Sequence, residues 1–229
     1  MQSDNVQTLQ TAQGGSIAAQ QNRVLRNTYM LLAISLVPTV AGAALGMALK
    51  LPFLTGWMGL IVFLVGAFGF MFAIEKNKNN GLGVALLLGF TFFMGLMLSN
   101  LLNRIMSFGN GGQLIALAFG GTSIIFFGMA TLASTIKKDL SGMGKFLFVG
   151  ALIIFVAAIA NVFLQIPALM LTISVLAIGI FSAFMLYDIN RIITGGETNY
   201  ISATLAIYLD IYNVFSNLLA LLGIFGGDD

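Results

Sequence analysis

Seven long apolar stretches divide the chain, and they limit its fold more than any other feature. The length of each stretch is close to that which an α-helix needs to span the hydrocarbon core of a bilayer, about 20 residues. The stretches lie at roughly 28–49, 53–74, 81–102, 112–135, 145–165, 168–193 and 201–224. The connections between them are short, so consecutive helices are expected to be antiparallel neighbours. The sequence predicts an all-α integral membrane protein, a bundle of seven transmembrane helices.

The composition supports this prediction. Of the 229 residues, 59% are hydrophobic and only 8% are charged. In a soluble domain roughly a quarter of all residues are charged, because the surface faces water. A membrane protein can have an apolar exterior, because lipid tails solvate it. The lipid bilayer is therefore the first expected partner.

The N-terminal segment differs from the rest of the chain. Residues 1–22 are rich in Gln, Ser and Asn and have few large apolar side chains. Because such a segment cannot bury enough surface to order, we predict a disordered cytoplasmic tail, followed by a transmembrane domain over residues 23–229. A basic region before an apolar stretch and a small-residue cleavage site are both missing, so the first helix is expected to act as an uncleaved insertion signal.

Cysteine and histidine are both absent, and this excludes several classes of site. The chain cannot form a disulfide, a Cys/His zinc site, a histidine-ligated haem or a His-activated nucleophile. We expect no cofactor and no enzymatic activity. The net charge of +2 is explained by basic residues in loops, so nucleic acid is not an expected partner.

Lysine and arginine predict the orientation of the bundle, since they concentrate in cytoplasmic loops. With the N-terminus inside, eight of the ten basic residues lie on the inner side. The inner residues are Arg23, Arg26, Lys76, Lys78, Lys137, Lys138, Lys145 and Arg191, and the outer ones are Lys50 and Arg104. Seven crossings then place the C-terminal end, with Asp228 and Asp229, in the periplasm. The alternative is a re-entrant last segment, which would return this end to the cytoplasm.

Two acidic residues lie within predicted spans. The other six of the eight acids are in tails or loops, namely Asp4, Glu75, Asp139, Glu197, Asp228 and Asp229. Asp188 lies toward the cytoplasmic end of the sixth span, and Asp210 lies inside the seventh. An ionisable side chain in lipid is costly, and by default it indicates a functional site with a partner.

The spacing predicts that the two aspartates approach each other. The sixth and seventh spans form a hairpin, and at about 1.5 Å per residue Asp188 lies about 9 Å and Asp210 about 15 Å from its turn. A tilt of the helices can bring them level. Asp210, Asn213 and Asn217 also share one face of the seventh helix, because they are three and seven residues apart. This polar stripe is expected to face the interior of the bundle.

Two neighbouring carboxyl groups favour three kinds of chemistry. They cannot both ionise cheaply, so one is expected to keep its proton. The pair could form a proton-sensitive gate, a site for a hard cation such as calcium, or an aspartyl acid/base dyad. The alternative is that each aspartate is merely paired, Asp188 for example with Arg191 one turn later.

The C-terminal third of the chain resembles the Bax inhibitor family. The resemblance rests on three runs, YDINRI at 187–192, GGETNY at 195–200 and YLDIYNVF at 208–215. Two further segments, RNTY at 26–29 and NVFLQIPAL at 161–169, are similar to the bacterial YccA-like branch of this family.

The family resemblance implies a bundle around a central C-terminal helix and an aspartate pair that senses pH in a calcium leak. Asp188 and Asp210 would then be the gate and the calcium-binding groups. The supporting polar residues would be Tyr187, Arg191, Asn213 and Asn217, and the turn motif would be Gly195, Gly196, Glu197 and Asn199. Leak-type members latch the closed state with a basic residue in the second helix, and residues 53–74 contain none. A latch would have to use Arg191 or another group.

The YccA-like branch implies a different role in the bacterial inner membrane. It implies association with the membrane-anchored AAA protease FtsH, which would grip the N-terminal tail. Two functions therefore stay open, a pH-sensitive calcium or cation leak and an interaction protein that modulates FtsH. An intramembrane aspartyl protease is not favoured, because the Gly-x-Gly-Asp motif of that class is absent around Asp210.

Overall fold

Seven long α-helices make up the described part of the chain. The structure, a computed structural model, describes residues 2–50, 56–136 and 138–226, and for residues 2–18 it describes the backbone alone. The helices are α1 (Gln2–Leu49), α2 (Gly56–Asn77), α3 (Gly81–Met106), α4 (Gly111–Thr135), α5 (Met143–Leu164), α6 (Pro167–Thr194) and α7 (Tyr200–Gly226). All seven are long and apolar enough to cross a membrane. The predicted seven-helix membrane bundle is confirmed.

Some sequence predictions fall on residues outside this description. They are the start of the second span at residue 53, Lys137 on the inner side, and Asp228 and Asp229 at the C-terminal end. The other helix boundaries differ from the predicted ones by a few residues, except at the start of α1. Boundaries move because polar residues at a membrane surface can continue a helix beyond the hydrocarbon core.

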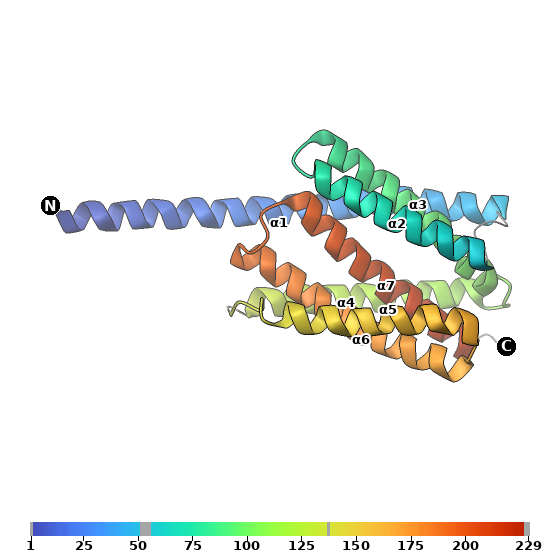
Figure 1. Cartoon of the computed structure of the whole chain (residues 1–229). Helices are drawn as coiled ribbons and strands as arrows, with labels where there is room; N and C mark the ends of the chain where they lie inside the picture. The colour runs from blue at the N-terminus through green and yellow to red at the C-terminus, as the bar shows by residue number, and fades with distance from the viewer. Residues whose placement is uncertain (1, 51–55, 137, 227–229) are drawn as a thin grey trace.

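Helix α7 lies at the centre of the bundle. It packs against α6, α4, α1, α3 and α2, whereas α5 packs mainly against α6. In Figure 1, α7 runs obliquely between one group formed by α1, α2 and α3 and another formed by α4, α5 and α6. The sequence of α7 fits this position, because buried residues such as Leu205, Ile207 and Val214 lie on several faces of the helix.

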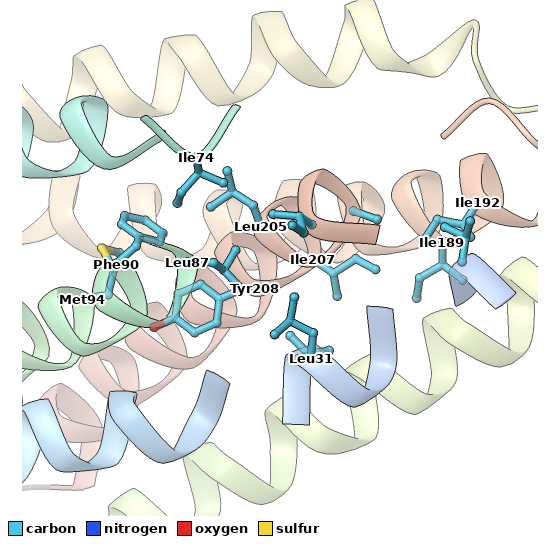
Figure 2. Packing of buried hydrophobic residues seen from close by; sticks show 14 of the residues in the cluster. Leu31, Ile74, Leu87, Phe90, Met94, Ile189, Ile192, Leu205, Ile207 and Tyr208 are labelled. Carbon is cyan, nitrogen blue, oxygen red and sulfur yellow. The ribbon is translucent and has the colours of Figure 1, made fainter. Parts of the chain in front are cut away.

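Two clusters of buried side chains hold α7 in place. The first surrounds Ile207 and Tyr208 with Leu31 of α1, Phe90 of α3 and Ile189 of α6, and Figure 2 shows these side chains converging from the separate helices. The second cluster lies farther along α7, around Leu219, and is formed by α1, α3, α4 and α7. The core therefore follows the central helix from one end to the other.

Helices α1 and α3 cross at very short range, and glycines allow it. A methyl group at Gly42 would lie 2.1 Å from the carbonyl oxygen of Phe92, and one at Gly95 would lie 2.0 Å from the carbonyl oxygen of Thr39. Small residues let helix backbones approach closely, which replaces the hydrophobic effect as a source of attraction in lipid. These glycines are part of the packing inside the bundle.

The start of α1 differs from the predicted disordered tail. The structure continues the helix back to Gln2, and Figure 1 shows this part of α1 projecting beyond the other helices. Residues 2–22 contain no proline and several Gln and Ala residues, which are compatible with a helix. The division into an N-terminal tail and a bundle remains a prediction.

Both ends of α7 are tied to other helices. At its start, the Asn199 amide donates to the carbonyl oxygen of Lys78 over 3.0 Å, in the turn between α2 and α3. At its end, the Asn110 amide donates to the carbonyl oxygen of Gly226 over 2.6 Å, in the turn between α3 and α4. Because α3 spans the bundle between these two turns, α7 also crosses the full bundle.

Candidate functional site

The two predicted aspartates meet inside the bundle. The carboxyl groups of Asp188, on α6, and Asp210, on α7, lie close enough to interact directly. Asp210 is only 4% exposed, and its Oδ2 atom is buried without a hydrogen-bond partner among the described residues. The Asp188 side chain is 12% exposed. The pair thus lies where the central helix contacts α6.

Two carboxyl groups this close favour a proton shared between them. An ionised carboxylate has only acceptors, so a hydrogen bond between two carboxyl groups needs a proton on one of them. The two groups also belong to different helices. Removing or adding a proton therefore changes the attraction between α6 and α7 directly, which makes the pair chemically able to report pH.

Arg191 adds a positive charge beside the pair. Its guanidinium lies 3.7 Å from a carboxylate oxygen of Asp188 and 3.6 Å from one of Glu197. It also lies over the Tyr187 ring, 5.6 Å from the ring centre. Because Arg191 is closer to Asp188 than to the buried Asp210, the negative charge of the pair is better stabilised on Asp188.

The turn motif connects α6 and α7 through its own hydrogen bonds. Gly195 ends α6 in the left-handed conformation, with φ at 81°, which a glycine adopts without a steric penalty. The Asn199 backbone N–H donates to Glu197 over 2.8 Å. The Asn199 side-chain oxygen in turn accepts from the first N–H groups of α7, those of Ile201 and Ser202. Gly196, the most exposed residue of the motif, accepts a long hydrogen bond from Arg191.

Asn213 and Asn217 do not join the pair. The Asn213 amide donates to the carbonyl oxygen of Leu209, and the Asn217 amide donates to that of Asn213, both over 2.8 Å. The two asparagines of the predicted stripe therefore direct their amide groups to their own helix, a common solution in lipid. Tyr187, another predicted supporting residue, points toward α5, because its hydroxyl lies next to Gly144.

The sequence analysis missed one residue next to the pair. Asn190 is fully buried, and its side chain donates to the carbonyl oxygens of Ile136 and Lys138 and accepts from the Leu140 N–H. These three bonds fix the α4–α5 connection against α6. The signal was present, because an asparagine within an apolar span needs partners as an aspartate does.

A resident metal site is not formed by the described residues. They contain no group of three or more Asp, Glu, His or Cys side chains able to hold a metal ion. Calcium takes six to eight oxygen ligands, and Asp188 and Asp210 supply only two side chains. The unpartnered oxygen of Asp210 suits a passing cation or a water molecule better than a permanently bound ion.

The comparisons with known proteins assign the chain to a family. Residues 21–227 match the family described as "Inhibitor of apoptosis-promoting Bax1". The chain belongs to the Bax inhibitor family. This range includes both aspartates, Arg191 and the turn motif, so the family resemblance seen in the sequence is confirmed over almost the whole chain.

Three relatives of this Bax inhibitor family protein come from bacteria. The Escherichia coli protein named "Modulator of FtsH protease YccA" is 42% identical over 202 residues, which cover 88% of this chain and 90% of the relative. An Escherichia coli protein named "Inner membrane protein YccA" has the same identity and coverage. An "Uncharacterized membrane protein" of Vibrio cholerae is 39% identical, over 92% of this chain and 93% of the relative. These names describe a modulator and membrane proteins and state no enzymatic reaction.

Proposed function

We propose that this Bax inhibitor family protein is a pH-sensitive calcium or cation leak of the bacterial inner membrane, with the Asp188–Asp210 pair as its gate. The observation that carries the proposal is the close approach of two carboxyl groups inside membrane-spanning helices, one of them buried with an unpartnered oxygen. The inner-membrane location is supported by the name of an Escherichia coli relative. The orientation follows from lysine and arginine, with the N-terminus in the cytoplasm.

Arg191 is the latch in this mechanism. A guanidinium held at the mouth of a cation path repels cations, and Asp188 helps to hold it there, 3.7 Å away. Protonation of Asp188 cancels the charge that attracts Arg191. The guanidinium then keeps its contacts with Tyr187 and, on the side of the turn, with Glu197 and Gly196. It can move away from Asp188 toward Glu197, and cations can approach the pair. Flux should therefore rise as the pH falls.

Replacing Arg191 tests this gate. We expect Arg191→Gln to raise calcium flux at about pH 8 to the level that the wild type reaches near about pH 6, because the blocking charge is absent at every pH. The measurement uses proteoliposomes loaded with a calcium-sensitive dye, scanned across this pH range.

The matched control for this variant is Arg104→Gln. Arg104 is an exposed arginine near the end of α3, away from the pair, so its loss should leave the pH profile unchanged. A wild-type protein that is folded but gives no flux above empty vesicles would rule out the leak. An Arg191→Gln profile identical to wild type would rule out the latch.

A second function is favoured by one relative. The Escherichia coli protein named a modulator of FtsH protease is 42% identical over 88% of this chain. We propose that this chain also engages FtsH, through the N-terminal part of α1 that projects from the bundle (Figure 1). A helix that projects beyond the rest of the bundle is a suitable handle for an AAA protease. The two functions can coexist in one protein.

A deletion separates the two functions. Removing residues 2–22 is expected to abolish co-purification with FtsH and the effect of the chain on degradation of an FtsH membrane substrate. From residue 19 on, where side chains are described, the first buried one is that of Val24, so the same deletion should leave the calcium flux within about twofold of wild type. Full co-purification of the shortened chain would contradict the proposed handle, and Asp210→Asn serves as the opposite control, losing flux but not association.

A further inference from the structure

An open cavity lies between α5 and α6 at the end of the bundle that is predicted to face the cytoplasm. It has a volume of about 540 Å³ and is lined by Ser141, Gly144, Lys145, Phe148, Val149 and Tyr187. We call it the α5–α6 groove. The α4–α5 connection forms one edge of the groove and is held in place by the buried Asn190. The groove is therefore a fixed part of the fold.

The two ends of the groove differ in polarity. Phe148 and Val149 are 64% and 54% exposed, and in a membrane-spanning helix such side chains face lipid. At the other end, Lys145 is exposed and has no ion-pair or hydrogen-bond partner among the described residues. The Tyr187 hydroxyl likewise makes no hydrogen bond in the described part of the chain. The groove thus has an apolar wall below a free cation and a free hydroxyl.

The surroundings of the groove favour an anion. The segment from residue 136 to residue 145 contains three lysines and one acid, Asp139. That acid already has its own partner, because the Ser141 hydroxyl and the Ser141 backbone N–H donate to it over 2.5 and 2.9 Å and hold its pKa below the usual range. The positive charge of Lys145 therefore remains available to a ligand.

We infer that the α5–α6 groove binds an anionic phospholipid of the cytoplasmic leaflet. Lys145 and the Tyr187 hydroxyl would hold the phosphate, and an acyl chain would lie along Phe148 and Val149. Basic pockets between transmembrane helices at the cytoplasmic surface are suited to anionic headgroups. This inference does not depend on the leak, although Tyr187 precedes Asp188 and a bound lipid would lie next to the acid pair.

A second cavity shows what distinguishes this groove. It lies between α6 and α7, has a volume of about 320 Å³, and is lined by Leu171, Thr172, Val175, Leu176, Leu221 and Phe225. This lining carries no charged side chain, so it can accept an acyl chain without selecting a headgroup. The second cavity is therefore an internal control on the same protein.

The test uses tryptophan fluorescence in the full-length protein. Trp57, the single tryptophan, is first replaced by phenylalanine, and a reporter is then introduced as Phe148→Trp in the groove or Phe225→Trp in the second cavity. Each protein is reconstituted into vesicles that contain brominated phosphatidylglycerol or brominated phosphatidylcholine. Bromine quenches a tryptophan that it contacts, so the two lipids can be compared at each site.

We expect the groove reporter to be quenched preferentially by phosphatidylglycerol, with a relative affinity of about fivefold. Lys145→Gln should remove this preference, whereas Lys76→Gln, a matched loss of charge on an exposed residue of α2, should retain it. The reporter at Phe225 should show no preference. Free inorganic phosphate should not displace the lipid, because it lacks the acyl chains.

Three outcomes would overturn the inference. They are equal quenching by the two lipids at the groove, retention of the preference in Lys145→Gln, and an equal loss in Lys76→Gln, which would indicate a general surface charge effect. Circular dichroism and gel filtration of each variant establish that the bundle is folded, so a loss of preference cannot come from unfolding.

Discussion

Asp210→Asn is expected to reduce pH-dependent calcium flux to the level of empty vesicles. The substitution keeps the size of the side chain but removes its ability to share a titrating proton with Asp188. Because Asp210 is buried and has an unpartnered oxygen, it is also the group that a passing cation would contact. Asp188→Asn should also remove the pH dependence but with the opposite level of flux, because a neutral side chain no longer holds Arg191 in place and the flux should stay high at every pH.

The control for this prediction is the same chemical change outside the membrane. Asp139→Asn alters an acid on the exposed α4–α5 connection and should leave the flux and its pH profile unchanged. Proteoliposome flux measured from about pH 6 to 8 decides the question. A normal pH profile in both Asp210→Asn and Asp188→Asn would show that the pair is structural and would leave FtsH modulation as the remaining function.

Gly95→Ala is expected to destabilise the bundle strongly. The added methyl group would lie 2.0 Å from the carbonyl oxygen of Thr39 and 2.9 Å from the backbone nitrogen of Ala43. Both contacts are with backbone atoms of α1, which cannot rotate away as a side chain can. Overpacking of this kind costs about 3 kcal/mol. Titration with a denaturing detergent, followed by circular dichroism, measures the change in the free energy of unfolding.

Gly128→Ala is the matched control for the packing prediction. Gly128 is also within a helix, α4, and a methyl group there would meet no atom within 4 Å. The two substitutions have the same effect on helix propensity, so a difference between them measures the α1–α3 contact alone. Equal stability of both variants would show that α1 and α3 can separate without cost.

The sequence was sufficient to predict the helices, and it singled out Asp188 and Asp210 as candidates. Length and hydropathy define membrane spans strongly, because every backbone polar group in lipid must be satisfied within a helix. Asp188 and Asp210 were visible for a related reason, since acids are rare in such spans. Their juxtaposition was expected from the short α6–α7 turn.

Other parts of the site depend on side-chain rotation, which helical periodicity does not determine. Asn213 and Asn217 share a face with Asp210, yet their amides turn back to their own helix. Asn190 has the opposite behaviour and reaches three backbone groups of another segment. An asparagine side chain can form its hydrogen bonds within its own helix or with another element, and only the packed structure distinguishes these two cases.

The helix at the centre of the bundle is synthesised after the six helices that surround it. Helices α1 to α3 and α4 to α6 can insert in order as the chain emerges, but α7 packs against members of both groups and completes both buried clusters. Assembly of the core must therefore wait until α7 has left the ribosome. Until then the surfaces that α7 will cover remain exposed on both groups of helices. Exposed surfaces of this kind are what cellular quality control of unassembled membrane proteins acts on.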